Sequence, residues 1–243
     1  LKDEEYINSH FIVMCTKKGV IKKTSLEQYS RPRTNGINAI TIREGDQLLE
    51  AKMTTGNSQI MMAVKSGKSI RFEEEKVRAM GRTAAGVRGI RLSDKNDEVV
   101  GMVCIDNLES SVLVVSENGY GKRSDVEDYR ITNRGGKGVK TINITEKTGN
   151  LITLKNVTDA DDLMVINKSG ITIRIGVDTL RVMGRATQGV KLIRLRDEDS
   201  IASVAKVSKF EDEDTDQEGE EIIERNTDEA ISSNVDNLTE ETS

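Results

Sequence analysis

Histidine, cysteine, proline and tryptophan are all scarce in this chain of 243 residues, which contains one His, two Cys, one Pro and no Trp. Cys15 and Cys104 do not form a C-x-x-C motif, so neither a zinc site nor a redox pair is indicated, and we expect both thiols to be buried and inert. His10 alone cannot supply a metal site or a Ser/His or Cys/His catalytic centre. We therefore expect no metal, no cofactor and no catalytic residue in this chain.

Aromatic residues make up only 3% of the chain. Because proteins that bind RNA or single-stranded DNA stack bases on aromatic rings, this composition disfavours both classes. No apolar run approaches the length of about 18 residues that a membrane span requires, so we expect no membrane partner. The chain starts at Leu1 without a charged and then apolar leader, and we interpret it as a fragment.

The net charge of −5 averages two unlike parts of the chain. Residues 211–243 contain 14 acidic residues and one basic residue, whereas residues 1–210 contain 35 basic and 27 acidic residues, a net charge of +8. Acidic segments with few apolar residues do not fold by themselves. We therefore predict a cationic domain over residues 1–209 and an acidic, disordered tail over residues 210–243.

An internal repeat organises the cationic part. The segment from Arg78 to Leu92 returns 103 residues later from Arg181 to Leu195 without a gap. Two glycines and one cation recur through four copies. The first glycines are Gly19, Gly67, Gly119 and Gly170, each followed four residues later by a cation (Lys23, Arg71, Arg123, Arg174), and the second glycines are Gly36, Gly86, Gly138 and Gly189. The spacing predicts four repeats of about 50 residues.

Each repeat contains four short β-prone segments. The expected first strands are Phe11–Cys15, Gln59–Val64, Ser111–Val115 and Leu163–Ile166, and the expected second strands are Val20–Lys23, Ser69–Phe72, Tyr120–Arg123 and Ile171–Ile175. The expected third strands are Ile37–Ile42, Val87–Leu92, Val139–Ile144 and Val190–Leu195, and the expected fourth strands are Gln47–Met53, Val99–Ile105, Leu151–Val157 and Ile201–Val207. Helical patterns are absent apart from a possible turn at Phe72–Arg78. The pattern predicts an all-β, propeller-like fold of four-stranded antiparallel blades, at about residues 10–54, 59–105, 111–157 and 162–207.

Cations recur at matched positions around the second glycine of the last three repeats, and Arg31 and Arg33 lie near that glycine in the first. They are Arg31, Arg33, Arg78, Arg82, Arg88, Arg130, Arg134, Lys140, Arg181, Arg185 and Lys191. Arg91 and Arg194 lie between apolar residues, so alternation places them on the face opposite to the apolar side chains. If blades stack around an axis, these positions form a curved cationic rim, which a bent DNA duplex can follow. The alternative is that the arginines are solvated side chains that keep the blades soluble.

A glycine-rich loop strengthens the DNA interpretation. It consists of Arg134, Gly135, Gly136, Lys137 and Gly138, and successive glycines let backbone N–H groups approach a phosphate. The loop lacks the Lys-Ser/Thr ending of a nucleotide-binding P-loop. We therefore predict contact with duplex DNA rather than with a nucleotide.

These motifs resemble the C-terminal domain of the DNA gyrase A protein. The residues that carry the resemblance are Val77–Gly81 with Thr83–Leu92, Glu117–Arg123, Val182–Arg185 and Gln188–Val190, and it covers about residues 1–209. The resemblance implies a β-pinwheel of six blades that exchange strands, of which this chain would hold the last four. It also implies that duplex DNA wraps around the basic outer edge, and in some members of the family the acidic tail regulates wrapping.

The resemblance further implies a bacterial, cytoplasmic, nucleoid-associated holoenzyme of two A and two B subunits, an ATP-dependent type IIA topoisomerase that introduces negative supercoils. ATP and Mg²⁺ would be used elsewhere in that holoenzyme. The catalytic tyrosine would lie in the N-terminal part of the gyrase A protein, within Ala-Met-Arg-Tyr. None of Tyr6, Tyr29, Tyr120 and Tyr129 has that context, so we expect this chain to cleave nothing.

The chain departs from the family pattern at its seven-residue box, Gln-Arg-Arg-Gly-Gly-Lys/Arg-Gly. Residues 134–138 match the last five positions, but Thr132 and Asn133 differ, and the loop lies in a late blade. We interpret it as a secondary copy and expect the principal box upstream. Two alternatives stay open: the corresponding C-terminal domain of topoisomerase IV, and a propeller scaffold for proteins, which would have apolar or mixed loops.

Overall fold

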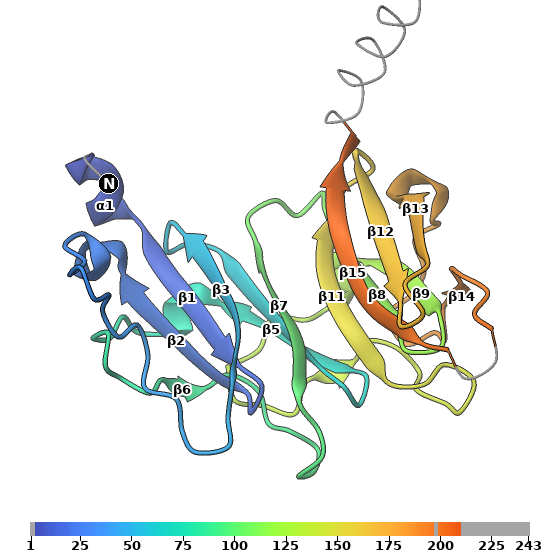
Figure 1. Ribbon diagram of the computed structural model, residues 1–243, viewed down its shortest axis with the longest axis horizontal. Helices are drawn as coiled ribbons and strands as arrows, with labels where there is room; N and C mark the ends of the chain where they lie inside the picture. The colour runs from blue at the N-terminus through green and yellow to red at the C-terminus, as the bar shows by residue number, and fades with distance from the viewer. Residues whose placement is uncertain (1–2, 197–198, 210–243) are drawn as a thin grey trace, which may run out of the picture.

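The computed structural model describes residues 3–196 and 199–209. Four antiparallel sheets follow one another along the chain, from the N-terminal sheet on the left of Figure 1 to the C-terminal sheet on the right. The predicted all-β fold with four repeats is confirmed. None of the described helices is long and apolar enough to cross a membrane.

The strands fall into four sheets. The first has the order β3 (Leu48–Thr54), β1 (Phe11–Thr16), β2 (Val20–Ser25), β6 (Val87–Arg88), and the second has the order β10 (Val139–Lys140), β5 (Lys68–Glu73), β4 (Gln59–Val64), β7 (Val99–Ile105). The third has the order β11 (Leu151–Val157), β8 (Ser111–Ser116), β9 (Tyr120–Asp125), β14 (Val190–Lys191), and the fourth has the order β13 (Thr172–Gly176), β12 (Asp161–Asn167), β15 (Ile201–Ser208).

Neighbouring repeats exchange a strand, as the resemblance implied. The short strands β6, β10 and β14 each pair with the second strand of the preceding repeat. Two expectations are therefore wrong. The described part of the fourth sheet has three strands, because none of the described residues pairs with the free edge of β13. Residues 37–42 form no strand, because no preceding sheet is present among the described residues.

The exchanged strands are also shorter than predicted, two residues instead of six. The reason is visible at β6, where the amides of Gly89 and Ile90 both donate to the carbonyl oxygen of Gly19, over 2.8 and 3.3 Å. Because two successive amides converge on one turn carbonyl, ladder pairing cannot continue. The third and fourth repeats end their exchanged strands in the same way, on the carbonyls of Gly67 and Gly119.

Helical turns are more numerous than predicted. A 3₁₀ turn follows the second strand of every repeat: η1 (Leu26–Tyr29), η2 (Glu74–Lys76), η3 (Val126–Asp128) and η4 (Val177–Thr179). Only η2 falls within the turn expected at Phe72–Arg78. The segment before the first sheet forms a short helix, α1 (Glu4–Ser9), whose N-terminus is capped by the side chain of Asp3.

The core consists of apolar layers between successive sheets. Along β4, Ile60 and Met62 pack towards the first sheet, whereas Met61 and Ala63 pack towards the third. Successive side chains of a strand point to opposite faces, so a strand covered on both sides is apolar throughout. Cys15 is buried as predicted, whereas Cys104 is partly buried, and burial raises the pKa of each thiol to about 12.

Candidate nucleic-acid interface

The candidate interface is built from the loops that lead into the exchanged strands. After η2, η3 and η4 the chain forms a single parallel bridge with the second strand of the preceding repeat, at Ala79, Ile131 and Val182. The residue before each bridge is Arg78, Arg130 or Arg181, and all three arginines are exposed. The strand exchange therefore fixes one exposed arginine at the same place in each of three repeats.

Successive loops are joined by a recurring backbone hydrogen bond. The amide of Arg91 donates to the carbonyl oxygen of Gly136 over 2.8 Å, and the amide of Asn143 donates to that of Thr187 over 3.1 Å. The first repeat makes the matching contact from Thr41 over 3.5 Å. The loops of the four repeats consequently form one continuous line rather than four separate projections.

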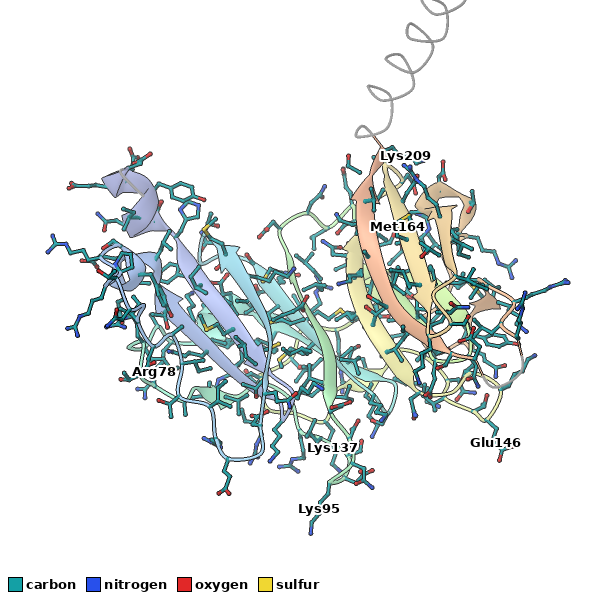
Figure 2. The ribbon with its side chains drawn as sticks, viewed as in Figure 1. Arg78, Lys95, Lys137, Glu146, Met164 and Lys209 are labelled. Carbon is teal, nitrogen blue, oxygen red and sulfur yellow. The ribbon has the colours of Figure 1, made fainter. Side chains whose placement is uncertain are left out.

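Most of the cations predicted to form the rim are solvent-exposed along this line. The exposed ones are Arg31, Arg33, Arg78, Arg88, Arg91, Arg130, Lys137, Lys140, Arg181, Lys191 and Arg194. None of these exposed cations forms a salt bridge with a carboxylate of the described residues. Figure 2 shows Arg78 and Lys137 towards the lower side of the molecule, whereas Lys209 lies at the upper side.

Three predicted cations, Arg82, Arg134 and Arg185, are instead partly buried between repeats. Arg134 donates from Nε to the carbonyl oxygen of Lys76 over 2.9 Å and from Nη1 to that of Arg88 over 3.1 Å. Arg185 makes the matching pair of contacts one repeat later, and Arg82 makes one of them one repeat earlier. We call these side chains the arginine clasps; their hydrogen bonds hold the loops together.

The glycine-rich loop is packed against its neighbours more closely than the sequence indicated. Gly138 has a φ of 72°, and a Cβ built on it would lie 2.4 Å from the carbonyl oxygen of Ser69. The amide of Gly135 donates to the carbonyl oxygen of Gly89, so this N–H already has a partner within the protein. Beside the loop is a hollow of about 220 Å³, lined among others by Arg130, Gly136 and Lys137.

The cations on the second strands have a role that sequence reasoning missed. The guanidinium of Arg71 donates to the carbonyl oxygens of Val126 and Tyr129 in the next repeat, over 2.7 and 3.0 Å, and burial lowers its pKa. Arg123 reaches the carbonyl oxygen of Leu180 in the same way. Their fixed spacing after the first glycine is the one sequence signal that could have indicated a shared contact between repeats.

Two lysines are buried beneath the clasps. Lys22 donates from Nζ to the carbonyl oxygen of Ala39 over 2.6 Å, and Lys122 donates to that of Gly184 over 2.6 Å. Burial lowers the pKa of Lys22, and it lowers the pKa of Lys122 to about 8 because desolvation disfavours the ammonium form. No sequence signal separated these two lysines from exposed ones.

Metal ligands do not gather anywhere in residues 3–196 and 199–209, where no group of three or more His, Cys, Asp or Glu side chains is arranged to hold an ion. The arrangement can instead bind an extended anion. Exposed cations recur at matched positions in three repeats, and no carboxylate of the described residues forms a salt bridge with them. Binding of this kind is electrostatic and follows the path of a phosphate backbone.

Comparison with known proteins gives one matching family. A family model described as the DNA gyrase C-terminal domain, a beta-propeller, matches residues 10–54, 58–106, 110–158 and 161–208. The DNA gyrase A protein of Staphylococcus aureus (strain MRSA252) is 45% identical over 219 residues, which are 90% of this chain and 25% of that protein. Its counterpart in strain COL is 45% identical over 210 residues, 86% of this chain and 24% of that protein. The chain spans about a quarter of the length of these curated relatives.

Solved structures with the same fold are more distant in sequence. The C-terminal domain of DNA topoisomerase IV has a TM-score of 0.79 and 23% identity, covering 86% of this chain and 64% of that one. The DNA gyrase A C-terminal domain has a TM-score of 0.72 and 24% identity, covering 82% of this chain and 66% of that one. The E. coli ParC C-terminal domain has a TM-score of 0.64 and 20% identity, with coverage of 83% and 82%.

Proposed function

The chain belongs to the DNA gyrase C-terminal domain family, and from that membership we propose that it binds duplex DNA along its line of exposed cations and bends it. One observation carries the proposal: hydrogen bonds join the loops of successive repeats, and each loop presents exposed cations that form no salt bridge with a carboxylate of residues 3–196 and 199–209. Phosphates recur along a duplex, so a line of this kind follows the backbone. Such a contact depends on the deformability of DNA more than on base sequence.

Within the line, the exposed and the partly buried cations have different roles. Arg78, Arg130 and Arg181 contact phosphates, together with Lys137 of the glycine-rich loop. The arginine clasps position the loops that carry these side chains. Residues 1–209 are the DNA-binding domain in this proposal.

We further propose that the chain acts as part of a DNA gyrase holoenzyme of two A and two B subunits in the bacterial cytoplasm. ATP hydrolysis and Mg²⁺ belong to other parts of that assembly, and so does DNA cleavage. The identity of 45% to the S. aureus gyrase A protein supports gyrase over topoisomerase IV, whose C-terminal domain shares the fold at 23% identity. Supercoiling by the reconstituted holoenzyme, with and without this chain, distinguishes the two enzymes.

A salt series on duplex binding tests the DNA proposal. If about six phosphates are neutralised, log K should fall against log salt with a slope near −5. The double variant Arg130→Glu/Arg181→Glu should weaken binding to all sequences alike and flatten the slope. The matched control is Lys52→Glu/Lys168→Glu, which makes the same charge change at two exposed lysines outside the line. A wild-type slope near zero would remove the DNA proposal.

The acidic segment 210–243 lies outside the described residues, and we propose that it competes with DNA for the exposed cations. A fully extended chain of that length reaches on the order of 100 Å. Figure 2 shows Lys209 at the upper side of the molecule and Lys137 at the lower side. Deleting residues 210–243 should tighten DNA binding most strongly at low salt, because screening weakens the competition. Equal affinities with and without the segment would contradict this role.

A further inference from the structure

Two lysines face each other where the third repeat gives its exchanged strand to the second sheet. Lys140 of β10 lies directly opposite Lys68 of β5 in the antiparallel register. The Cβ atoms of such a pair lie about 4.5–5.5 Å apart, and like charges in this position are destabilising. Among the strand pairs of the described residues, no other register position opposes two side chains of the same charge.

Within the part of the chain that the structure describes, no carboxylate pairs with either lysine in a salt bridge. Lys68 donates from Nζ to the hydroxyl oxygen of Ser93 over 3.3 Å, and Lys140 donates to the amide oxygen of Asn143 over 3.2 Å. Both acceptors are neutral, so neither ammonium group is in direct contact with a carboxylate of the described residues.

The other two exchanged strands also carry a cation, but the residue opposite it is uncharged. Arg88 of β6 lies opposite the apolar Val20. Lys191 of β14 lies opposite Tyr120, with its ammonium 5.9 Å from the ring centroid, and Lys147 approaches the same ring to 5.4 Å. An aromatic face attracts cations. The cation at these two junctions is therefore accommodated without an anion, and the one at the Lys68–Lys140 junction is not.

We infer that Lys68 and Lys140 together bind one phosphate of the DNA, an inference that rests on the proposed function. A bound phosphate turns the repulsion between the two ammonium groups into attraction towards a shared anion. Lys68 follows the turn glycine Gly67 directly, so the DNA contact extends from the outer loops along the exchanged strand towards the turn end of the blade. The carbonyl oxygen of Lys140 accepts a hydrogen bond from Arg185, which fixes its backbone in the line of loops.

The test is Lys68→Gln in the full chain, because a binding role and a structural role predict opposite changes in the stability of the free protein. Relief of the repulsion should raise the thermal midpoint without DNA by about 1–3 °C. Loss of the phosphate contact should weaken binding to duplexes of any sequence and make the log–log salt slope shallower by up to about 0.9. Lys68→Arg keeps the charge and should retain the wild-type slope.

Lys52→Gln is the matched control, since Lys52 is exposed on β3, at the far edge of the first sheet from its exchanged strand, and has a carboxylate partner in Glu50. It should leave the slope unchanged and should not raise the midpoint. A steep wild-type slope that Lys68→Gln does not alter would overturn this inference and leave the DNA-binding proposal intact. A flat wild-type slope would remove both. A lower midpoint in Lys68→Gln would assign a structural role to Lys68 and overturn the inference.

Discussion

Arg134 donates a hydrogen bond from Nη1 to the backbone carbonyl oxygen of Arg88 over 3.1 Å. Both residues belong to the set of cations that recurs around the second glycine of the repeats, but their side chains have different roles. Arg88 presents its side chain to solvent, and Arg134 holds the backbone of Arg88 in place while also binding the carbonyl oxygen of Lys76. The same relationship links Arg185 to Lys140. If the proposed function holds, a substitution in a clasp should change both folding and DNA binding, whereas one at an exposed arginine should change DNA binding alone.

Arg134→Ala should lower the free energy of unfolding by about 1–3 kcal/mol, because two charge-assisted hydrogen bonds to carbonyl oxygens are lost. Arg130→Ala removes an exposed arginine four residues away and should change stability by less than about 0.5 kcal/mol. Urea unfolding of both variants measures the difference. Both should weaken duplex binding, and equal unfolding free energies would contradict the clasp.

The buried ion pair between Lys23 and Glu74 offers a second test. The carboxylate of Glu74 is fully buried, lies 3.0 Å from the Lys23 ammonium, and accepts a hydrogen bond from Thr54 over 2.7 Å. At the next two junctions the corresponding residues are Val126 and Val177, both buried. A valine at the position of Glu74 is therefore compatible with the fold.

Glu74→Val alone should lower the free energy of unfolding by about 3–5 kcal/mol, because it leaves the Lys23 ammonium buried and unpaired. The double variant Lys23→Met/Glu74→Val should recover most of that loss, since neither buried charge remains. Thermal or urea unfolding of the two single variants and the double variant forms the cycle. Additive losses would show that the two residues do not act as a pair.

Lys122 should make stability depend on alkaline pH. Burial lowers its pKa from 10.5 to about 8, so between these values the unfolded chain binds more protons than the folded one. Stability contributed by this residue therefore rises with pH across that window, by up to roughly 3 kcal/mol. Urea unfolding at pH 7 and pH 10 should give a smaller gain for Lys122→Met than for the wild type. Parallel changes in both proteins would rule out the shifted pKa.

A glycine can be required for a positive φ or for close approach of another backbone, and Gly138 and Gly36 allow these two requirements to be compared. Both have a positive φ, 72° and 77°, but a Cβ on Gly138 would lie 2.4 Å from the carbonyl oxygen of Ser69, whereas nothing lies within 4 Å of one on Gly36. Gly36→Ala should cost only the left-handed backbone penalty of about 1–2 kcal/mol. Gly138→Ala should cost more, because the exchanged strand must move away from β5. Equal losses of thermal stability in the two variants would show that the close approach of Gly138 to the Ser69 carbonyl oxygen is unimportant.

The sequence determined the repeat, the fold class and the central strands. The predicted strand Gln59–Val64 has its observed bounds, because it is apolar after Gln59 and bounded by turn residues. The exchanged strands could not be placed in the same way. Val87 and Arg88 pair with the second strand of the preceding repeat, and this pairing ends where the next two amides donate to the turn carbonyl of Gly19. Gly19 lies far earlier in the chain, so nothing local to the segment encodes where the strand ends.

For the candidate interface, the sequence by itself determined which positions carry recurring positive charge. Only the tertiary structure decided which of these charges face solvent. Arg130 and Arg134 are four residues apart on the same loop, yet the first is exposed and the second reaches two carbonyl oxygens of the preceding repeat. The physical reason is that a long flexible side chain takes its role from the groups within its reach. Those groups belong to another repeat, and folding alone brings them there.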